Sequence, residues 1–303
     1  MKRDLISIHD LSAAEVTGLL ELSADVKRDA GKYALALAGK SLGMIFQKSS
    51  TRTRVSFEVG MFQLGGQALF LSGRDIQLGR GETIHDTAKV MSRYVDGIMA
   101  RTFAHQTVLD LARFGSVPVI NGLTDLLHPC QILADLLTIQ ERFPRLDEVT
   151  IAYLGDGNNV ANSLLYGAAK VGATIRVATP GGHGPNAEVA VTAKADAQAS
   201  GATIEILEDP AAAVDGAHVI YTDTWTSMGQ DDEGEARRRL FQPFQVNAEL
   251  LAQARPEAIV MHCLPAHRGD EITYAVMDGP QSVVFDEAEN RLHAQKAVMT
   301  LLM

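Results

Sequence analysis

Two arginines and four hydroxyl side chains are concentrated in one short stretch of the chain, residues 49–54 (SSTRTR). The stretch follows an apolar segment at 42–46, typical of a buried strand, and precedes Val55, Val59 and Phe62 at helical spacing. The first turn of such a helix carries free backbone N–H groups and a partial positive charge. This combination predicts an anion site, and phosphate is its natural ligand.

The helix that follows this stretch is predicted to be buried. Phe57 and Met61 form a second apolar row, and Glu58 is the only charged residue at 55–64. A helix that is apolar on several faces packs inside a protein, so its basic first turn is expected to open into a cleft. The alternative is that Ser50 only caps the helix and that the arginines are solvated.

Two further polar residues stand where predicted strands end in the first half of the chain. Arg101 follows a strand-like segment at 95–100, and His128 follows the next one and precedes Pro129, which fits the first turn of a helix. Ligands of open α/β sheets bind outside the carboxyl ends of the strands. His128 alone could equally be structural, but together with Arg52 these residues predict a cationic cradle.

A glycine-rich turn in the second half, GDGNN at 155–159, raises the possibility of a dinucleotide site. The nicotinamide fingerprint needs a third glycine where Val160 stands, and Asp156 would face a pyrophosphate poorly. Asn158 and Asn159, at the start of a predicted helix, suit a carboxylate or an amine better.

The second half also carries polar residues of a different character after its strands. Asp223, Ser227 and Met228 follow one strand-like segment, and Cys263 follows another. Cys263 could be a nucleophile, but neither a helix N-terminus nor an adjacent base activates it in the sequence, so we expect an orienting or buried thiol.

A metal site is not expected around Cys263. His262, Cys263 and His267 are potential ligands, but their spacing matches no closed zinc set. We therefore predict no metal site.

The composition excludes several classes of protein. The chain of 303 residues has 37 acidic and 27 basic residues and a formal charge of −10, which disfavours binding to nucleic acid or to anionic membranes. Two distant cysteines fit a reducing compartment. With no apparent signal peptide and no long apolar run, a soluble cytoplasmic protein is expected.

Strand-like and helix-like segments alternate along the chain, which predicts an α/β fold of parallel sheets covered on both faces. The length exceeds that of one usual hydrophobic core, so two doubly wound domains are expected, 1–143 and 144–286, followed by a helix at 287–303. A last strand is predicted at 283–285. The polar segment 226–244 lacks periodicity and is interpreted as a lid or a disordered surface.

Four motifs, in the same order, resemble those of the aspartate/ornithine transcarbamoylase family, and the resemblance spans essentially the whole chain. They are STRTR at 50–54, HPCQ at 128–131, DTWTSMG at 223–229 and HCLP at 262–265. The last two resemble the ornithine branch of the family. The resemblance implies transfer of the carbamoyl group of carbamoyl phosphate to the δ-amine of L-ornithine, giving citrulline and phosphate, without a cofactor.

The resemblance also implies ligands, residue by residue. Carbamoyl phosphate would be bound by Ser50, Thr51, Arg52, Thr53, Gln77, Arg101, His128, Pro129, Cys130, Gln131, Cys263, Leu264 and Arg291. Ornithine would be bound by Asn159, Asp223, Ser227 and Met228. The residues implied in catalysis are Arg52, Arg101, His128, Asp223 and Cys263.

The same resemblance implies how the domains and subunits are arranged. Domain 1–143 would bind carbamoyl phosphate, domain 144–286 would bind ornithine across a cleft, and helix 287–303 would pack back on the first domain. Gln77 matches a loop that reaches a neighbouring subunit's site in the family, which implies a homotrimer or an assembly of trimers.

Three other functions stay open on the sequence. They are a transcarbamoylase for another amine, such as an acylated ornithine or putrescine, a nicotinamide-dependent dehydrogenase, and a non-catalytic binding protein of the same fold. The direction of the reaction in the cell, towards citrulline or back, is also left open.

Overall fold

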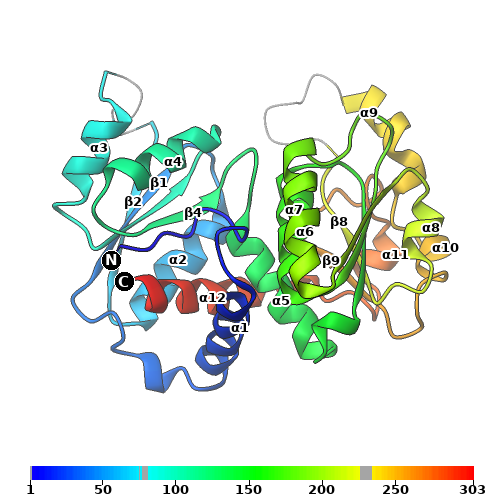
Figure 1. The fold of residues 1–303 in the computed structure, drawn as a ribbon, viewed down its shortest axis with the longest axis horizontal. Helices are drawn as coiled ribbons and strands as arrows, with labels where there is room; N and C mark the ends of the chain where they lie inside the picture. The colour runs from blue at the N-terminus through cyan, green and yellow to red at the C-terminus, as the bar shows by residue number, and fades with distance from the viewer. Residues whose placement is uncertain (1, 75, 77–80, 226–233) are drawn as a thin grey trace. The chain divides into compact units, whose positions relative to one another are not determined.

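The computed structural model describes the whole chain except residues 1, 75, 77–80 and 226–233. It divides into two compact units, one of residues Met1–Leu137 with Glu289–Met303 and the other of residues Thr138–Ala288. Each unit contains one parallel sheet (Figure 1). Among the described residues, no helix has the length and apolarity needed to cross a membrane.

The sheet of the first unit has the strand order β2-β1-β3-β4, and all its neighbouring strands are parallel. Its strands are β1 (Ser41–Phe46), β2 (Gln67–Ser72), β3 (Gly97–Arg101) and β4 (Val119–Leu123). The central strands are buried on both faces, as a parallel sheet between helices requires. The winding reverses between β1 and β3, so the carboxyl ends of these two strands form the expected ligand site.

Helices cover both faces of this sheet (Figure 1). They are α1 (Ala13–Arg28), α2 (Thr51–Gln63), α3 (Ile84–Met91), α4 (His105–Phe114), the start of α5 (Pro129–Arg142) and the end of α12 (Val284–Leu302), with a short 3-10 helix at Gly31–Tyr33. A capping box, Ser12 with Glu15, starts α1. On one face, Val108 and Leu111 of α4 pack with Ile45 and Ile98 in a single apolar cluster.

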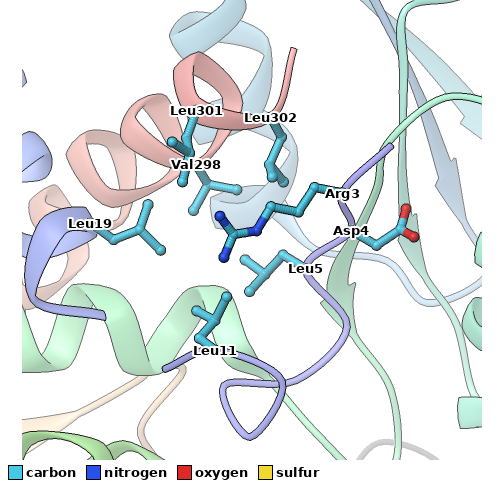
Figure 2. A pocket seen from close by; sticks show the side chains of 8 residues that line it. All are labelled: Arg3, Asp4, Leu5, Leu11, Leu19, Val298, Leu301 and Leu302. Carbon is cyan, nitrogen blue, oxygen red and sulfur yellow. The ribbon is translucent and has the colours of Figure 1, made fainter. Parts of the chain in front are cut away.

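The segment before α1 is held against β4 and the end of α12. Leu5 donates its N–H to Val119 O at 2.9 Å and forms a parallel bridge with Ile120. Figure 2 shows the Arg3 side chain among leucines of this segment, of α1 and of α12. The Arg3 guanidinium forms an ion pair with Glu15 of α1. The ion pair therefore fastens the first segment to the neighbouring α1, and apolar packing fastens both to α12 at the other end of the chain.

The prediction that α2 is buried on several faces was wrong for one of its rows. Phe57 and Met61 are fully buried, but Val55, Val59 and Phe62 are 49%, 36% and 80% exposed in the single chain. The reason is that α2 packs with only one side on its own unit, so the opposite apolar row has no cover within this chain.

The sheet of the second unit has the order β7-β6-β5-β8-β9, again with parallel neighbours. Its strands are β5 (Thr150–Leu154), β6 (Thr174–Ala178), β7 (Thr203–Leu207), β8 (Val219–Thr222) and β9 (Ile259–His262). The winding reverses between β5 and β8. The predicted fold class, two doubly wound parallel sheets with helices on their faces, is confirmed.

Helices also flank the second sheet on two sides (Figure 1). They are α6 (Asn159–Val171), α7 (Ala187–Ser200), α8 (Pro210–Val214), α9 (Gly234–Phe241), α10 (Ala248–Leu251) and α11 (Tyr274–Met277), with 3-10 turns at Leu146–Glu148 and Gln242–Phe244. Val214 of α8 and Met277 of α11 pack on Leu154 and Val260 in one buried cluster.

The structure contradicts the strand predicted at 283–285 and part of the interpretation of 226–244. The segment 283–285 is not a strand, because α12 begins at Val284. Pairing with β9 is an isolated bridge at Ser282, in which Val260 N–H binds Gln281 O and Val283 N–H binds Val260 O. Of the segment 226–244, residues 226–233 lie outside the described residues, and the rest is ordered as α9 and a 3-10 turn in which Phe241 and Phe244 are buried, so disorder is contradicted there. The interpretation of this segment as a lid stays a prediction.

The packing of the first segment predicts a specific cost of truncation. Leu5 is 2% exposed, so Leu5→Ala should lower the free energy of unfolding by about 2–5 kcal/mol through lost burial and a cavity. Leu35→Ala is the matched control, because Leu35 is 77% exposed and should change stability by less than about 0.5 kcal/mol. Urea unfolding of both variants measures the difference; equal effects would contradict this packing.

Candidate active site

The SSTRTR stretch forms the turn between β1 and α2, as predicted. Ser50 is the N-cap, and its Oγ accepts the Thr53 N–H at 3.2 Å. Thr51 and Arg52 occupy the first turn of the helix, where backbone N–H groups are free to bind an anion. The stretch therefore lies at the carboxyl end of β1, on one side of the winding reversal.

Two buried guanidinium groups converge on one hydroxyl in this turn. Arg101, the last residue of β3, donates from Nη1 to Thr53 Oγ1 at 3.5 Å, and Arg291 of α12 donates from Nη2 to the same oxygen at 2.7 Å. Arg101 is 8% exposed and Arg291 is 3% exposed. Desolvated positive charges this close together repel each other, so the arrangement favours an anionic ligand.

His128 lies next to the same cations. The pKa of His128 is lowered well below its usual value, first by complete burial and then by the positive charges of Arg291, Arg101 and Arg52. The imidazole is therefore neutral near pH 7, and it can donate one hydrogen bond without carrying a charge. The predicted cationic cradle of Arg52, Arg101 and His128 is thus brought together in one unit, and Arg291 completes it.

The other residues of the HPCQ motif form the first turn of α5. Pro129 is the first helical residue. Gln131 Nε2 donates to Asp135 Oδ1 at 2.8 Å, and both side chains are buried. Cys130 donates from Sγ to Asn121 O at 3.4 Å, and burial raises the pKa of its thiol to about 12. Cys130 is therefore a neutral thiol in the wall behind the cradle.

A second polar group lies at the carboxyl ends of β8 and β9 in the other unit. Cys263 donates from Sγ to Asp223 Oδ1 at 3.0 Å, and Asn158 donates from Nδ2 to Asp223 Oδ2 at 2.7 Å. The backbone N–H of Thr224 also binds Asp223 Oδ1, at 2.8 Å. Cys263 acts here as a donor that orients a carboxylate, in line with the predicted orienting thiol.

His262 fixes the backbone that follows Cys263. Its Nδ1 accepts the Leu264 N–H at 2.9 Å, so its Nε2 carries the proton that it shares with Glu271 Oε1 at 3.0 Å. Leu264 adopts a left-handed conformation with φ of 59°, which this hydrogen bond helps to hold.

Three potential metal ligands of this group lie close together. The ligand atoms of Asp223, His262 and Cys263 are within 4.8 Å of one another. Both ring nitrogens of His262 are, however, occupied by Leu264 and Glu271, so the imidazole has no lone pair for a metal. The geometry favours an organic ligand that meets Asp223 and Cys263.

The sequence analysis missed two residues that support the loop after β5. Arg237 of α9 pairs with Asp156 at 2.9 Å and donates from Nε to Trp225 O at 2.8 Å. Burial raises the pKa of Asp156, and the charge of Arg237 opposes that rise. Tyr153 donates to Asp156 O at 2.8 Å. No local pattern pointed to Arg237, because it lies in a polar segment far from its partner.

The remaining predicted ligands are placed only in part. Asn159 is the first residue of α6 and is half-buried. Gln77, Ser227 and Met228 lie outside the described residues.

Two family models match the chain in succession. The model described as "Aspartate/ornithine carbamoyltransferase, carbamoyl-P binding domain" matches residues 3–141. The model described as "Aspartate/ornithine carbamoyltransferase, Asp/Orn binding domain" matches residues 147–302.

Curated proteins and solved structures give the same result. The ornithine carbamoyltransferase of Thermococcus kodakarensis is 56% identical, over 99% of this chain and 96% of that protein. The solved ornithine carbamoyltransferase of Pyrococcus furiosus has a TM-score of 0.96 at 55% identity, covering 99% of this chain and 97% of that one. The enzyme of Gloeobacter violaceus has a TM-score of 0.91 at 52% identity, covering 100% and 99%. From its four motifs to its overall fold, the chain belongs to the aspartate/ornithine carbamoyltransferase family.

Proposed function

We propose that the protein is an ornithine carbamoyltransferase, which transfers the carbamoyl group of carbamoyl phosphate to the δ-amine of L-ornithine. The products are L-citrulline and phosphate. The observation that carries the proposal is the convergence of Arg101 and Arg291 on Thr53, at the carboxyl ends of β1 and β3. It supports a site for a phosphorylated substrate in a chain whose relatives bear this enzyme's name over their full length.

The first unit would bind carbamoyl phosphate. The hydroxyls and N–H groups of the β1–α2 turn, with Arg52, Arg101 and Arg291, would hold the phosphate. His128 and Gln131 would bind the carbamoyl end, and by family resemblance Gln77, Pro129, Cys130, Cys263 and Leu264 would complete the set. Since His128 is neutral, it would donate a hydrogen bond to the carbonyl oxygen without giving up its proton in the ground state.

The second unit would bind ornithine. A carboxylate held by three donors, as Asp223 is, suits the ammonium group of an amino acid. By the resemblance, Asn159, Ser227 and Met228 share this role, and Cys263 and Asp223 orient the amine that reacts.

The chemistry requires little beyond charge stabilisation and positioning. A neutral δ-amine attacks the carbamoyl carbon, the carbonyl oxygen gains negative charge, and the bond to phosphate breaks. Arg52, Arg101 and His128 would stabilise these charges, a contribution that is often the largest in catalysis. The departing phosphate can accept the amine proton, so the scheme needs no protein base. The remaining rate enhancement comes from binding both substrates close together in reactive geometry.

Assembly and location are proposed on separate grounds. The uncovered apolar row of α2, Val55, Val59 and Phe62, supports burial against another copy, in line with the homotrimer or assembly of trimers that the family implies. Two free cysteines suit a reducing compartment, which supports the cytoplasm. The anabolic name of the Pyrococcus furiosus relative supports a role in arginine biosynthesis.

The direct test is citrulline formation from carbamoyl phosphate and L-ornithine by purified protein in chelator-treated buffer. Turnover under these conditions would establish the reaction and exclude a required dissociable metal. Putrescine and N-acylated ornithine are offered in parallel, and turnover only with one of these would reassign the acceptor. No turnover with any of these amines would favour the alternative that the chain is a non-catalytic binding protein.

Removing the Asp223 carboxylate should weaken ornithine selectively. We expect Asp223→Ala to raise the KM for ornithine by about 10- to 100-fold, because hydrogen bonds to charged groups contribute about 1.5–3 kcal/mol. The KM for carbamoyl phosphate should change by less than about twofold. Asp147→Ala is the control, since Asp147 is exposed and pairs with Arg145 in the same unit. Equal losses for both substrates would refute the assignment.

The neutral His128 predicts a pH dependence of stability. Its pKa is lowered in the folded protein, so below about pH 6.5 the unfolded state binds more protons and stability falls as the pH falls. The loss from this group is at most about 1.4 kcal/mol per pH unit. His128→Gln should therefore lose less stability than the wild type between about pH 7 and about pH 5 in urea unfolding. Parallel curves for the two proteins would show that His128 is not held neutral.

A further inference from the structure

Three loops leave the first sheet beside one another and carry the residues of the cradle. Backbone hydrogen bonds already link them. Gln47 N–H binds Arg101 O, Thr102 N–H binds Leu123 O, and Asp125 N–H binds Phe103 O, each at 2.9 Å. The loops after β1, β3 and β4 are thus held in series at the carboxyl edge of the sheet.

Lys48 connects the same three loops through its side chain. It belongs to the loop after β1, and its side chain is only 7% exposed. Its ammonium forms an ion pair with Asp125 of the loop after β4. It also lies 4.7 Å from the ring centre of Phe103, in the loop after β3. One buried side chain therefore contacts one residue from each of the other two loops.

This contact constrains residues that lie close by in sequence. Lys48 is two residues before Ser50 and four before Arg52, and Asp125 is three residues before His128. A buried ammonium needs a compensating charge or ring, so it keeps its place only while its partners keep theirs. A shift of about 1 Å in catalytic groups can cost about 100-fold in rate.

We infer that the Lys48–Asp125 ion pair, packed on Phe103, is a positioning brace that sets the distance between the phosphate-binding turn and His128. Lys48 acts through these loops and not as a ligand of the substrate. The inference rests on the proposed function, because the loops that it joins are those assigned to carbamoyl phosphate.

The structure supplies a matched control at the opposite edge of the same sheet. Lys40, just before β1, forms an ion pair with Asp96, just before β3, at 3.3 Å. This pair also joins two loops, but at the amino ends of the strands, away from the cradle. Its loss should leave the site unchanged.

Asp125→Asn separates a brace from a direct electrostatic role. If Lys48 bound phosphate itself, or acted only through its charge, removing the negative Asp125 would strengthen anion binding. If the pair is a brace, the same change loosens both loops and weakens anion binding. The two explanations therefore predict opposite signs.

The experiment compares the wild type with Lys48→Met, Asp125→Asn, the double variant Lys48→Met/Asp125→Asn, and the control variants Lys40→Met and Asp96→Asn. Kinetics give kcat and the KM for each substrate, and calorimetry gives the Kd of inorganic phosphate. Both single brace variants should raise the KM for carbamoyl phosphate and the Kd of phosphate by about tenfold or more, with ornithine's KM within about twofold. The double variant should be no worse than Lys48→Met, because the two changes remove one interaction.

Several outcomes would overturn the brace. They are unchanged or tighter phosphate binding by Asp125→Asn, additive losses in the double variant, or equal losses in the control variants. If Lys48→Met fails to fold, Asp125→Asn decides, since Asp125 is 58% exposed. If the wild-type protein binds phosphate but forms no citrulline, the proposed function is refuted. The brace is then tested by comparing the Kd of phosphate between the wild type and the variants. Wild-type protein that does not bind phosphate would overturn both.

Discussion

The structure of the first unit depends on holding positive charge out of water at one point. Arg101 and Arg291 are nearly fully buried and donate to the same Thr53 hydroxyl, with His128 close enough for their charges to lower its pKa. Such groups repel one another and give up hydration, so the site is unfavourable until an anion arrives. The surrounding elements must therefore be rigid enough to resist that repulsion.

The parallel sheet supplies this rigidity. Arg52, Arg101 and His128 are each fixed at the end of a strand or at the start of a helix, where backbone hydrogen bonds continue the sheet or the helix. Arg291 comes from the interior of α12. Arg101 ends β3, the SSTRTR turn follows β1, and His128 precedes α5. In the second unit the same principle places Asp223 and Cys263 after β8 and β9, with hydrogen bonds from neighbouring loops fixing the carboxylate. One architecture thus presents a cationic group in one unit and an anionic group in the other.

Much of this was predictable from the sequence, because the signals are local. Apolar patterns predicted strand β1 and helix α2, and polar residues after apolar runs placed Arg52, Arg101 and His128 at strand ends. The features that the sequence did not predict depend on tertiary contacts. The exposed row of α2 looks like core in the sequence, since apolar periodicity does not say what covers a face. Arg237 and Lys48 owe their roles to residues far along the chain, Asp156 and Asp125, which no local pattern connects. The 283–285 segment has the composition of a strand, but its pairing with β9 is one bridge at Ser282, and the chain enters α12 at Val284.

The position of Arg291 in the chain also has a consequence for biosynthesis. Arg291 belongs to the first unit, yet it is encoded after every strand of both sheets. On the ribosome, the strands of the first sheet and the β1–α2 turn are synthesised long before α12. During that interval Thr53 lacks the Arg291 donor, and the turn carries less positive charge than in the finished protein. The buried positive charge around Thr53 is therefore complete only after the last helix has been synthesised, near the end of translation.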